Sequence, residues 1–195
     1  MTTKTPQAIY QLKVTLVGSK PPIWRRILVP DNITLGKLHM VLQVVMGWLD
    51  EHLHQFKMGM EFYGVPDKEN SLFGMSVQDE NKTILSSLLL KEKDSITYDY
   101  DFGDDWEHKL TLEKRLPYDS TMQLPLCIKG KRACPPEDCG GIWGYMELIE
   151  IMSDPSHPEH EERAEWLEEA FGIENFEPEC FDLEEINAML KVECQ

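Results

Sequence analysis

The sequence predicts an α+β fold, with an antiparallel or mixed sheet from the N-terminal two-thirds packed against helices and an acidic, helical C-terminal third. Three observations predict it. The first 60 residues contain stretches in which apolar and polar residues alternate, as in half-buried strands. Strand patterns come early in the chain and helical patterns late, which favours α+β over a parallel α/β sheet. The 195 residues suit one domain, with a strand-rich part over about 7–141 and a helical part over about 142–195.

The first half of the strand-rich part is predicted to hold three strands and one long helix. Residues 9–17 alternate strictly, and residues 23–29 form a second strand that ends before a proline. Thr34 is suited to cap a helix with a leucine-rich face, and Gly47 is suited to end it. Residues 52–58 alternate again and predict a third strand.

The middle of the chain predicts an exposed excursion followed by a hairpin. Residues 61–82 are rich in Gly, Pro, Asp and Asn, which is typical of surface loops, and residues 84–90 suit a short apolar helix or turn. Residues 95–102 and 106–113 are expected to pair as a hairpin, with Gly103 supplying the positive φ of the turn.

The last third predicts helices after a loop. Residues 117–141 contain four prolines and three glycines and are expected to lack regular structure. Helical patterns then cover about 142–153 and 158–172. A final helix is expected to begin at Asp182, because Glu185 three residues later completes a capping box.

The net charge of −16 is concentrated at the C-terminal end. Residues 1–58 carry seven Lys or Arg and three Asp or Glu, whereas residues 150–195 carry two basic and fifteen acidic residues. Nucleic-acid binding relies on cationic surface, so direct nucleic-acid binding is not expected. The acidic C-terminal helices suit a basic protein partner, although such charge runs are also typical of a solvated helix face.

Composition also bears on the location of the protein. No apolar run reaches the roughly 18–20 residues that a membrane span needs, and the N-terminus has no apolar stretch of signal-peptide length. The five cysteines are odd in number and widely spaced, which favours reduced thiols. We therefore expect a cytoplasmic protein that does not enter a membrane.

Several longer motifs resemble one known family. They are Ile9-Tyr10-Gln11-Leu12-Lys13-Val14, Pro22-Ile23-Trp24-Arg25-Arg26, Met46-Gly47-Trp48, His52-Leu53-His54-Gln55-Phe56, Tyr98-Asp99-Tyr100-Asp101-Phe102-Gly103-Asp104 and Arg132-Ala133-Cys134-Pro135-Pro136-Glu137-Asp138-Cys139-Gly140-Gly141. Over about residues 7–190, the chain resembles the plasmid pRiA ORF-three-like family, some of whose members are passengers of insertion elements with a TnpR-like label. The resemblance implies an α+β fold and a prokaryotic, often mobile-element setting, and it implies no established reaction. A recombinase activity is not expected, since the chain has no basic DNA-binding helix.

A metal site is the first candidate for chemistry. Side chains two apart on a strand share one face, so His52 and His54 could bind one ion, a zinc ion being the best suited. The residues with suitable donor atoms are His52, His54, Asp104 and His108, with Asp101, Cys134 and Cys139 as second choices. The alternative is that these histidines are half-buried strand residues hydrogen-bonded to the aspartates, and that the cysteines are a small apolar or redox pair.

Two weaker candidates involve cationic residues. Arg132 precedes Gly140 and Gly141, which open a predicted helix whose free amides could bind an anion, or which simply form a tight turn. Arg25, Arg26 and Trp48 could form a partner surface by stacking, or pack inside the domain and pair with carboxylates. No Ser-His-Asp or Cys-His arrangement with a nucleophile elbow is found, so no complete catalytic set is predicted.

The function that these patterns favour is an accessory or protein-interaction domain. A metal-binding domain or metal-dependent hydrolase is the alternative, and it requires the histidines and aspartates to converge. A nucleic-acid-associated role is a weaker third hypothesis.

Overall fold

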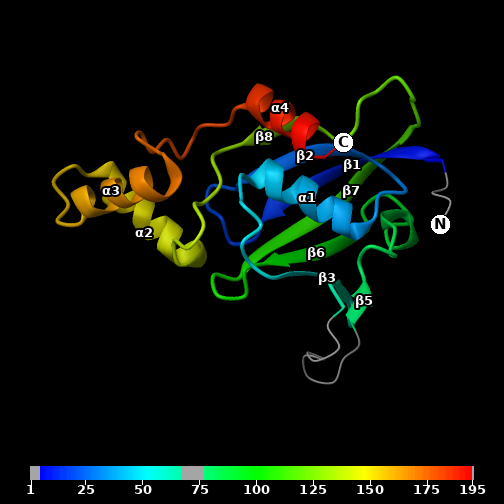
Figure 1. Ribbon diagram of the computed structural model, residues 1–195, viewed down its shortest axis with the longest axis horizontal. Coiled ribbons are helices and arrows are strands. Elements are labelled where there is room, and N and C mark those ends of the chain that lie inside the picture. The colour runs from blue at the N-terminus through cyan, green and yellow to red at the C-terminus, as the bar shows by residue number, and fades with distance from the viewer. Residues whose placement is uncertain (1–4, 67–76, 195) are drawn as a thin grey trace.

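A mixed eight-stranded sheet forms the centre of the computed structural model, which describes residues 5–66 and 77–194 (Figure 1). The strands lie in the order β5-β4-β3-β6-β7-β1-β2-β8, and every neighbouring pair is antiparallel except β4 and β5. Their bounds are β1 Ala8–Leu16, β2 Trp24–Pro30, β3 His54–Met58, β4 Glu61–Gly64, β5 Val77–Asp79, β6 Ser95–Tyr100, β7 Trp106–Pro117 and β8 Leu126–Lys131.

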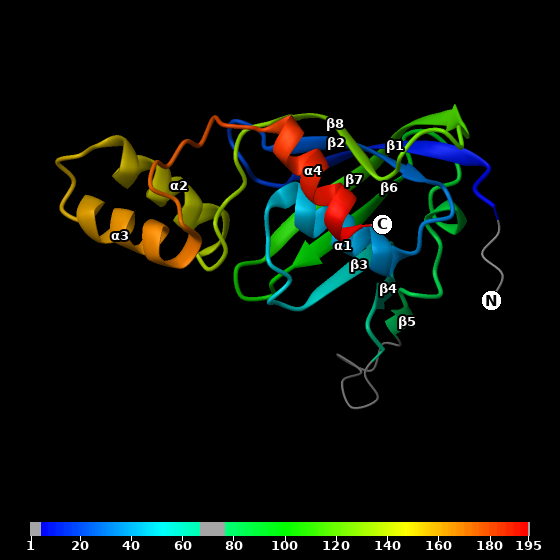
Figure 2. The ribbon, with the colours of Figure 1, turned by 45° about the horizontal axis from the view of Figure 1, so that its top comes forward.

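The helices cover one face of this sheet and extend beyond one end of it. Their bounds are α1 Leu35–Met46, α2 Gly141–Ser153, α3 His160–Phe171 and α4 Leu183–Glu193, with a 3₁₀ turn at Leu85–Ser87. Helix α1 lies across the sheet, and α4 packs against both α1 and β8. Helices α2 and α3 pack on each other and project away from the sheet (Figure 2). The α+β prediction, with helices following the sheet towards the C-terminus, is confirmed.

The alternating pattern of the first strand places the core. Leu12, Val14 and Leu16 of β1 are fully buried beneath the helices, whereas Lys13 and Thr15 point to the opposite, half-buried face. Because β1 pairs with both β2 and β7, the same alternation continues into those strands. Each fully buried leucine contributes roughly 1.5–3 kcal/mol to folding.

Helix α1 begins and ends where the sequence predicts. The Thr34 side chain accepts a hydrogen bond from the Lys37 backbone amide at 3.3 Å. Gly47 adopts φ +77° and its amide closes the C-terminal turn on the Gln43 and Val44 carbonyls. The helix is buried on most of its surface because α4 covers the side that faces away from the sheet.

Some predicted boundaries are wrong, each for an identifiable reason. Strand β3 begins at His54, so His52 lies outside the strand. The presumed loops 61–82 and 117–141 contain β4, β5 and β8, which are short strands at the two ends of the sheet and need little alternation. Of the first loop, residues 67–76 lie outside the described part of the chain.

The turn between β6 and β7 also differs from the prediction. Its left-handed residues are Asp101 (φ +55°) and Asp105 (φ +56°), and Gly103 has no positive φ. Aspartate tolerates this conformation because its side chain can bond the nearby backbone. Here Asp101 Oδ1 accepts from the Gly103 amide at 2.8 Å. No helix in the described part of the chain is long and apolar enough to cross a membrane.

Candidate functional site

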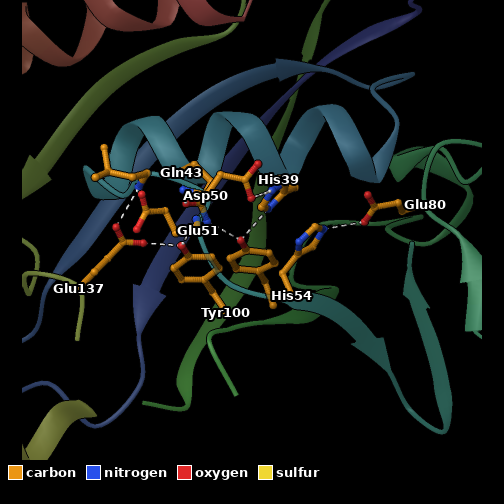
Figure 3. A network of polar contacts seen from close by, with 10 residues as sticks. His39, Gln43, Asp50, Glu51, His54, Glu80, Tyr100 and Glu137 are labelled. Atoms are coloured by element: carbon orange, nitrogen blue, oxygen red, sulfur yellow. Dashed lines mark hydrogen bonds and ion pairs between the residues drawn. The ribbon is translucent and has the colours of Figure 1, made fainter. Parts of the chain in front are cut away.

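A chain of polar side chains, all buried except that of Asp50 at its end, joins α1 to β6 beneath the helix (Figure 3). Gln43 Nε2 donates to the Tyr98 hydroxyl at 2.9 Å, so this hydroxyl donates onwards to His39 Nδ1 at 2.8 Å. His39 Nε2 then donates to Asp50 Oδ1 at 2.8 Å. Burial lowers the pKa of His39, which favours this neutral form. All four groups are thereby satisfied, and they hold α1 and the segment that follows it on the sheet.

The second histidine of this network is His54, the first residue of β3. His54 Nε2 bonds Glu80 Oε2 at 2.9 Å, and its ring stacks on His39 with centroids 3.5 Å apart and planes 5° from parallel. Ligand atoms of His39, Asp50 and His54 lie within 4.8 Å of one another. A metal ion must lie near the plane of each imidazole that binds it, and one ion cannot do so for two stacked rings. In this conformation the group is therefore a hydrogen-bonded structural network.

A second branch fixes the loop that precedes α2. The Tyr100 hydroxyl donates to Glu137 Oε1 and accepts from the Glu51 amide at 3.1 Å. Glu137 Oε2 accepts from the Leu49 amide at 3.2 Å. Trp48 donates to the Pro135 carbonyl at 3.0 Å and stacks on Tyr100 at 5.0 Å. The loop around Pro135 is thus held against the C-terminal end of α1.

The structure separates the residues predicted to bind a metal. His52 lies beside Asp101 and Asp138, away from the His54 group. His108 is fully buried next to Trp48 and belongs to neither of the two possible ligand groups found among the described residues. Burial lowers the pKa of His108 to about 4, so it is neutral at physiological pH.

Asp104 and the two cysteines also have internal roles. Asp104 Oδ2 accepts from the Gly140 amide at 3.1 Å. Cys134 Sγ accepts from Arg25 at 2.9 Å, and burial raises the pKa of its thiol. Burial also raises the pKa of Cys139 to about 12. Both thiols are free and protonated at neutral pH, and a protonated thiol is a poor metal ligand.

The residues predicted to bind an anion are used within the chain. Arg132 is buried, pairs with Glu179 at 2.8 Å and donates to the Pro21 carbonyl at 3.3 Å. At the start of α2, the Gly140 amide already donates a hydrogen bond to the Asp104 carboxylate. A Cβ atom on Gly141 would lie 2.5 Å from the Asp104 carbonyl oxygen, so this glycine permits a close approach of two loops.

Two of the three residues predicted to form a partner surface are not on the surface. Arg25 and Trp48 are only 3% and 5% exposed. Arg25 faces α1 because it pairs with Val14 on the inner side of the sheet, and its Nε donates to the Val45 carbonyl at 2.8 Å. Arg26 lies on the outer face and forms an ion pair with Glu113. The arrangement matches the alternative that the sequence left open, internal packing and pairing.

A large apolar groove lies where these internal contacts end. It occupies about 510 Å³ between the C-terminal end of α1, the loop at residues 133–137, the end of α3 and one side of α4. Its apolar lining includes Val45, Met46, Leu49, Phe171, Ile186 and Met189. Sequence reasoning missed it because its walls come from four segments far apart in the chain.

The charged groups at the groove leave it acidic. The guanidinium of Arg25 donates hydrogen bonds to three backbone carbonyls and to Cys134 Sγ, so it is not available to a ligand. Asp182 and Glu185, at the start of α4, are exposed at the rim. Residues 173–185, which lead from α3 into α4, contain six acidic residues and no Lys or Arg.

Sequence and structure comparisons agree on the class of protein. The family model described as plasmid pRiA4b ORF-3-like protein matches residues 8–185. The chain belongs to this family.

One relative is similar in sequence, and one solved structure is similar in fold and sequence. The chain is 41% identical over 160 residues to the "Uncharacterized protein y4hQ" of Sinorhizobium fredii (strain NBRC 101917 / NGR234), covering 82% of this chain and 80% of that protein. A crystal structure of the "Protein of Unknown Function MM3350" from Methanosarcina mazei Go1 is similar with a TM-score of 0.81 and 40% identity, over 93% of this chain and 98% of that one. Neither name states an activity, so the family establishes none for this chain.

Proposed function

We propose that this protein is a cytoplasmic accessory domain that binds a partner protein through the groove between α1 and α4. The carrying observation is the combination of a 510 Å³ apolar groove with an acidic rim. Apolar clefts of this size are typical of ligand-binding sites. The free cysteines fit the reducing compartment that we propose.

The groove suits one kind of occupant, an amphipathic segment with apolar side chains on one face and Lys or Arg on the other. Its lining includes Met189, which is 45% exposed and whose flexible side chain can adapt to different apolar partners. Cations on the partner would face the acidic residues 173–185. An acidic or purely polar segment would meet repulsion at this rim and leave the apolar floor uncovered.

The walls of the groove differ in how firmly they are held. The loop around Pro135 is fixed by two side chains. Trp48 donates to the Pro135 carbonyl, and Glu137 accepts from the Tyr100 hydroxyl and the Leu49 amide. Helix α4 is held to β8 by Asn187, which exchanges hydrogen bonds of 2.8 Å with both the amide and carbonyl of Cys127. The groove is therefore a preformed site with two anchored sides, which reduces the entropy cost of binding.

The test uses a fluorescein-labelled amphipathic helix of roughly 15 residues, built from leucine and lysine, and fluorescence anisotropy. Met189→Lys places a charge in the groove and is expected to weaken binding about 10- to 100-fold, since burial of one such side chain contributes roughly 1.5–3 kcal/mol. Val192→Lys is the matched control, because Val192 is a more exposed residue of the same helix (77% against 45%) and does not line the groove. It should change the affinity less than about twofold.

Two further peptides separate groove binding from charge attraction. A leucine–glutamate helix of the same pattern and a scrambled leucine–lysine peptide should both bind much more weakly. Equal effects of Met189→Lys and Val192→Lys, or equal binding of the scrambled peptide, would refute the proposal.

A further inference from the structure

Three loops meet at His52, away from the groove side chains that carry the proposed function. His52 belongs to the segment before β3, Asp101 to the turn after β6, and Asp138 to the loop before α2. His52 Nδ1 lies 3.8 Å from Asp101 Oδ1, and His52 Nε2 lies 3.4 Å from Asp138 Oδ1. One ligand atom from each residue lies within 4.8 Å of the other two.

The groups in this cluster are not satisfied by one another. His52 Nε2 is buried and has no hydrogen-bond partner among the described residues, and its 3.4 Å contact with Asp138 Oδ1 lacks hydrogen-bond geometry. Asp101 is only 7% exposed; its Oδ1 accepts from the Gly103 amide, and within the described residues its ion-pair contact is with His52 rather than with a Lys or Arg. A buried carboxylate without a cation is costly. A cation bound between His52 Nε2 and the carboxylates of Asp101 and Asp138 would satisfy these groups.

We infer that His52, Asp101 and Asp138 form a binding site for a divalent transition-metal ion such as Zn²⁺. One imidazole and two carboxylates are ligands that such ions accept, whereas Ca²⁺ and Mg²⁺ prefer oxygen ligands alone. An imidazole binds one ion through one nitrogen, and here Nε2 is the suitable atom: it lies 3.4 Å from Asp138 Oδ1, about the separation of two ligands that are each about 2.1 Å from a tetrahedral ion. Asp101 would be the third ligand, since ligand atoms of all three residues lie within 4.8 Å of one another. Asp138 is largely exposed and free to complete the geometry.

Hydrogen bonds between the three loops hold His52, Asp101 and Asp138 close together before any ion binds. Asp104 accepts from the Gly140 amide and so fixes the β6–β7 turn to the loop that carries Asp138. The Asp101 amide donates to the Leu53 carbonyl at 2.9 Å and fixes the same turn to the residue after His52. Three protein ligands would leave an open position for water, as in catalytic rather than structural zinc sites.

The cluster differs in this respect from the His39–Asp50–His54 group. There, both nitrogens of His39 and Nε2 of His54 already have hydrogen-bond partners, and the rings are stacked. The comparison gives a matched control, since each group contains an aspartate with an exposed side chain, Asp138 in one and Asp50 in the other.

The test is a titration of the chelator-treated full chain with CoCl₂, followed by visible absorption, and with ZnCl₂, followed by calorimetry. We expect one ion per chain and cobalt d–d bands without a sulfur charge-transfer band. Asp138→Asn should lower the affinity at least about 10-fold, and Asp50→Asn should leave it within about twofold.

Asp138 is exposed, so its substitution should not affect folding, and circular dichroism would verify this. His52→Gln is the second variant, and it should also lose the ion. The inference fails if no stoichiometric ion binds, or if Asp138→Asn and His52→Gln bind like wild type. A thiolate charge-transfer band would equally overturn it, because it would show adventitious binding to cysteine.

Discussion

The buried histidine of β7 offers a direct test of the core beneath α1. His108 Nδ1 lies 3.3 Å from the Tyr98 carbonyl, and its Nε2 has no partner among the described residues. Replacing His108 with phenylalanine keeps an aromatic ring beside Trp48 and removes the only titratable atoms of the side chain. The substitution should therefore change how stability depends on pH, apart from any packing cost that is the same at every pH.

The magnitude follows from the pKa of His108, which burial lowers from 6.5 to about 4. Between these two values the unfolded chain binds a proton that the folded chain does not, so acid favours unfolding. The loss of unfolding free energy is about 2 kcal/mol at pH 5 and about 3 kcal/mol at pH 4, relative to pH 7.5. The stabilising effect of a neutral His108 is complete above pH 6.5 and is lost as the pH falls towards 4.

Urea denaturation at several pH values between 7.5 and 5 measures this difference. Wild-type protein should lose about 2 kcal/mol more than His108→Phe over this interval, although both lose stability from His39, whose pKa burial also lowers. Parallel curves for the two proteins would refute the reasoning, because they would show that His108 is protonated equally in the folded and unfolded states.

Three further substitutions test other parts of the structure. In Gly144→Ala, the new Cβ would lie 1.9 Å from the Cys139 carbonyl oxygen, so we expect a loss of about 2 kcal/mol or more in urea denaturation, and wild-type stability would show that this loop does not pack on α2. The Arg26 side chain lowers the pKa of Glu113 to about 2; the resulting stability is present above about pH 4.5 and is lost as the pH falls towards 2. Glu113→Gln should therefore cost about 1 kcal/mol at pH 7, after allowance for solvent screening, and much less near pH 2, whereas a cost that is the same at both pH values would contradict the ion pair. Asp182→Ala removes the cap of α4 and should cost about 1 kcal/mol, seen as faster hydrogen exchange confined to α4; unchanged exchange there would show that the cap does not hold the helix.

The central strands and the helix ends could be predicted because local physics fixes them. The alternation in residues 9–17 reflects one buried and one half-buried face of the strand. Gly47 ends α1 because glycine readily adopts the left-handed conformation, and Asp182 begins α4 because its carboxylate accepts from the first free amides. The short strands β4, β5 and β8 escaped prediction because they lie at the sheet ends, where tertiary pairing rather than pattern selects a strand.

The candidate sites were predictable only in part. His52 and Asp101 do meet, but Asp138 comes from a loop 37 positions further along the chain, and no local pattern indicates it. His54 was expected beside His52, yet β3 begins at His54 and the two side chains enter different groups. The signal for His39 was present, as a polar residue within the apolar face of a predicted helix, four positions before Gln43.

The groove is the centre of the functional account, and backbone NMR of the labelled protein tests it most directly. On titration with the leucine–lysine helix, we predict chemical-shift changes in residues 44–49, 133–137 and 180–189, the segments that supply most of the groove lining. The outer face of β1 and β2, which carries Lys13 and Arg26, should remain unchanged. Changes confined to that outer face, or spread evenly over the acidic surface, would contradict the account.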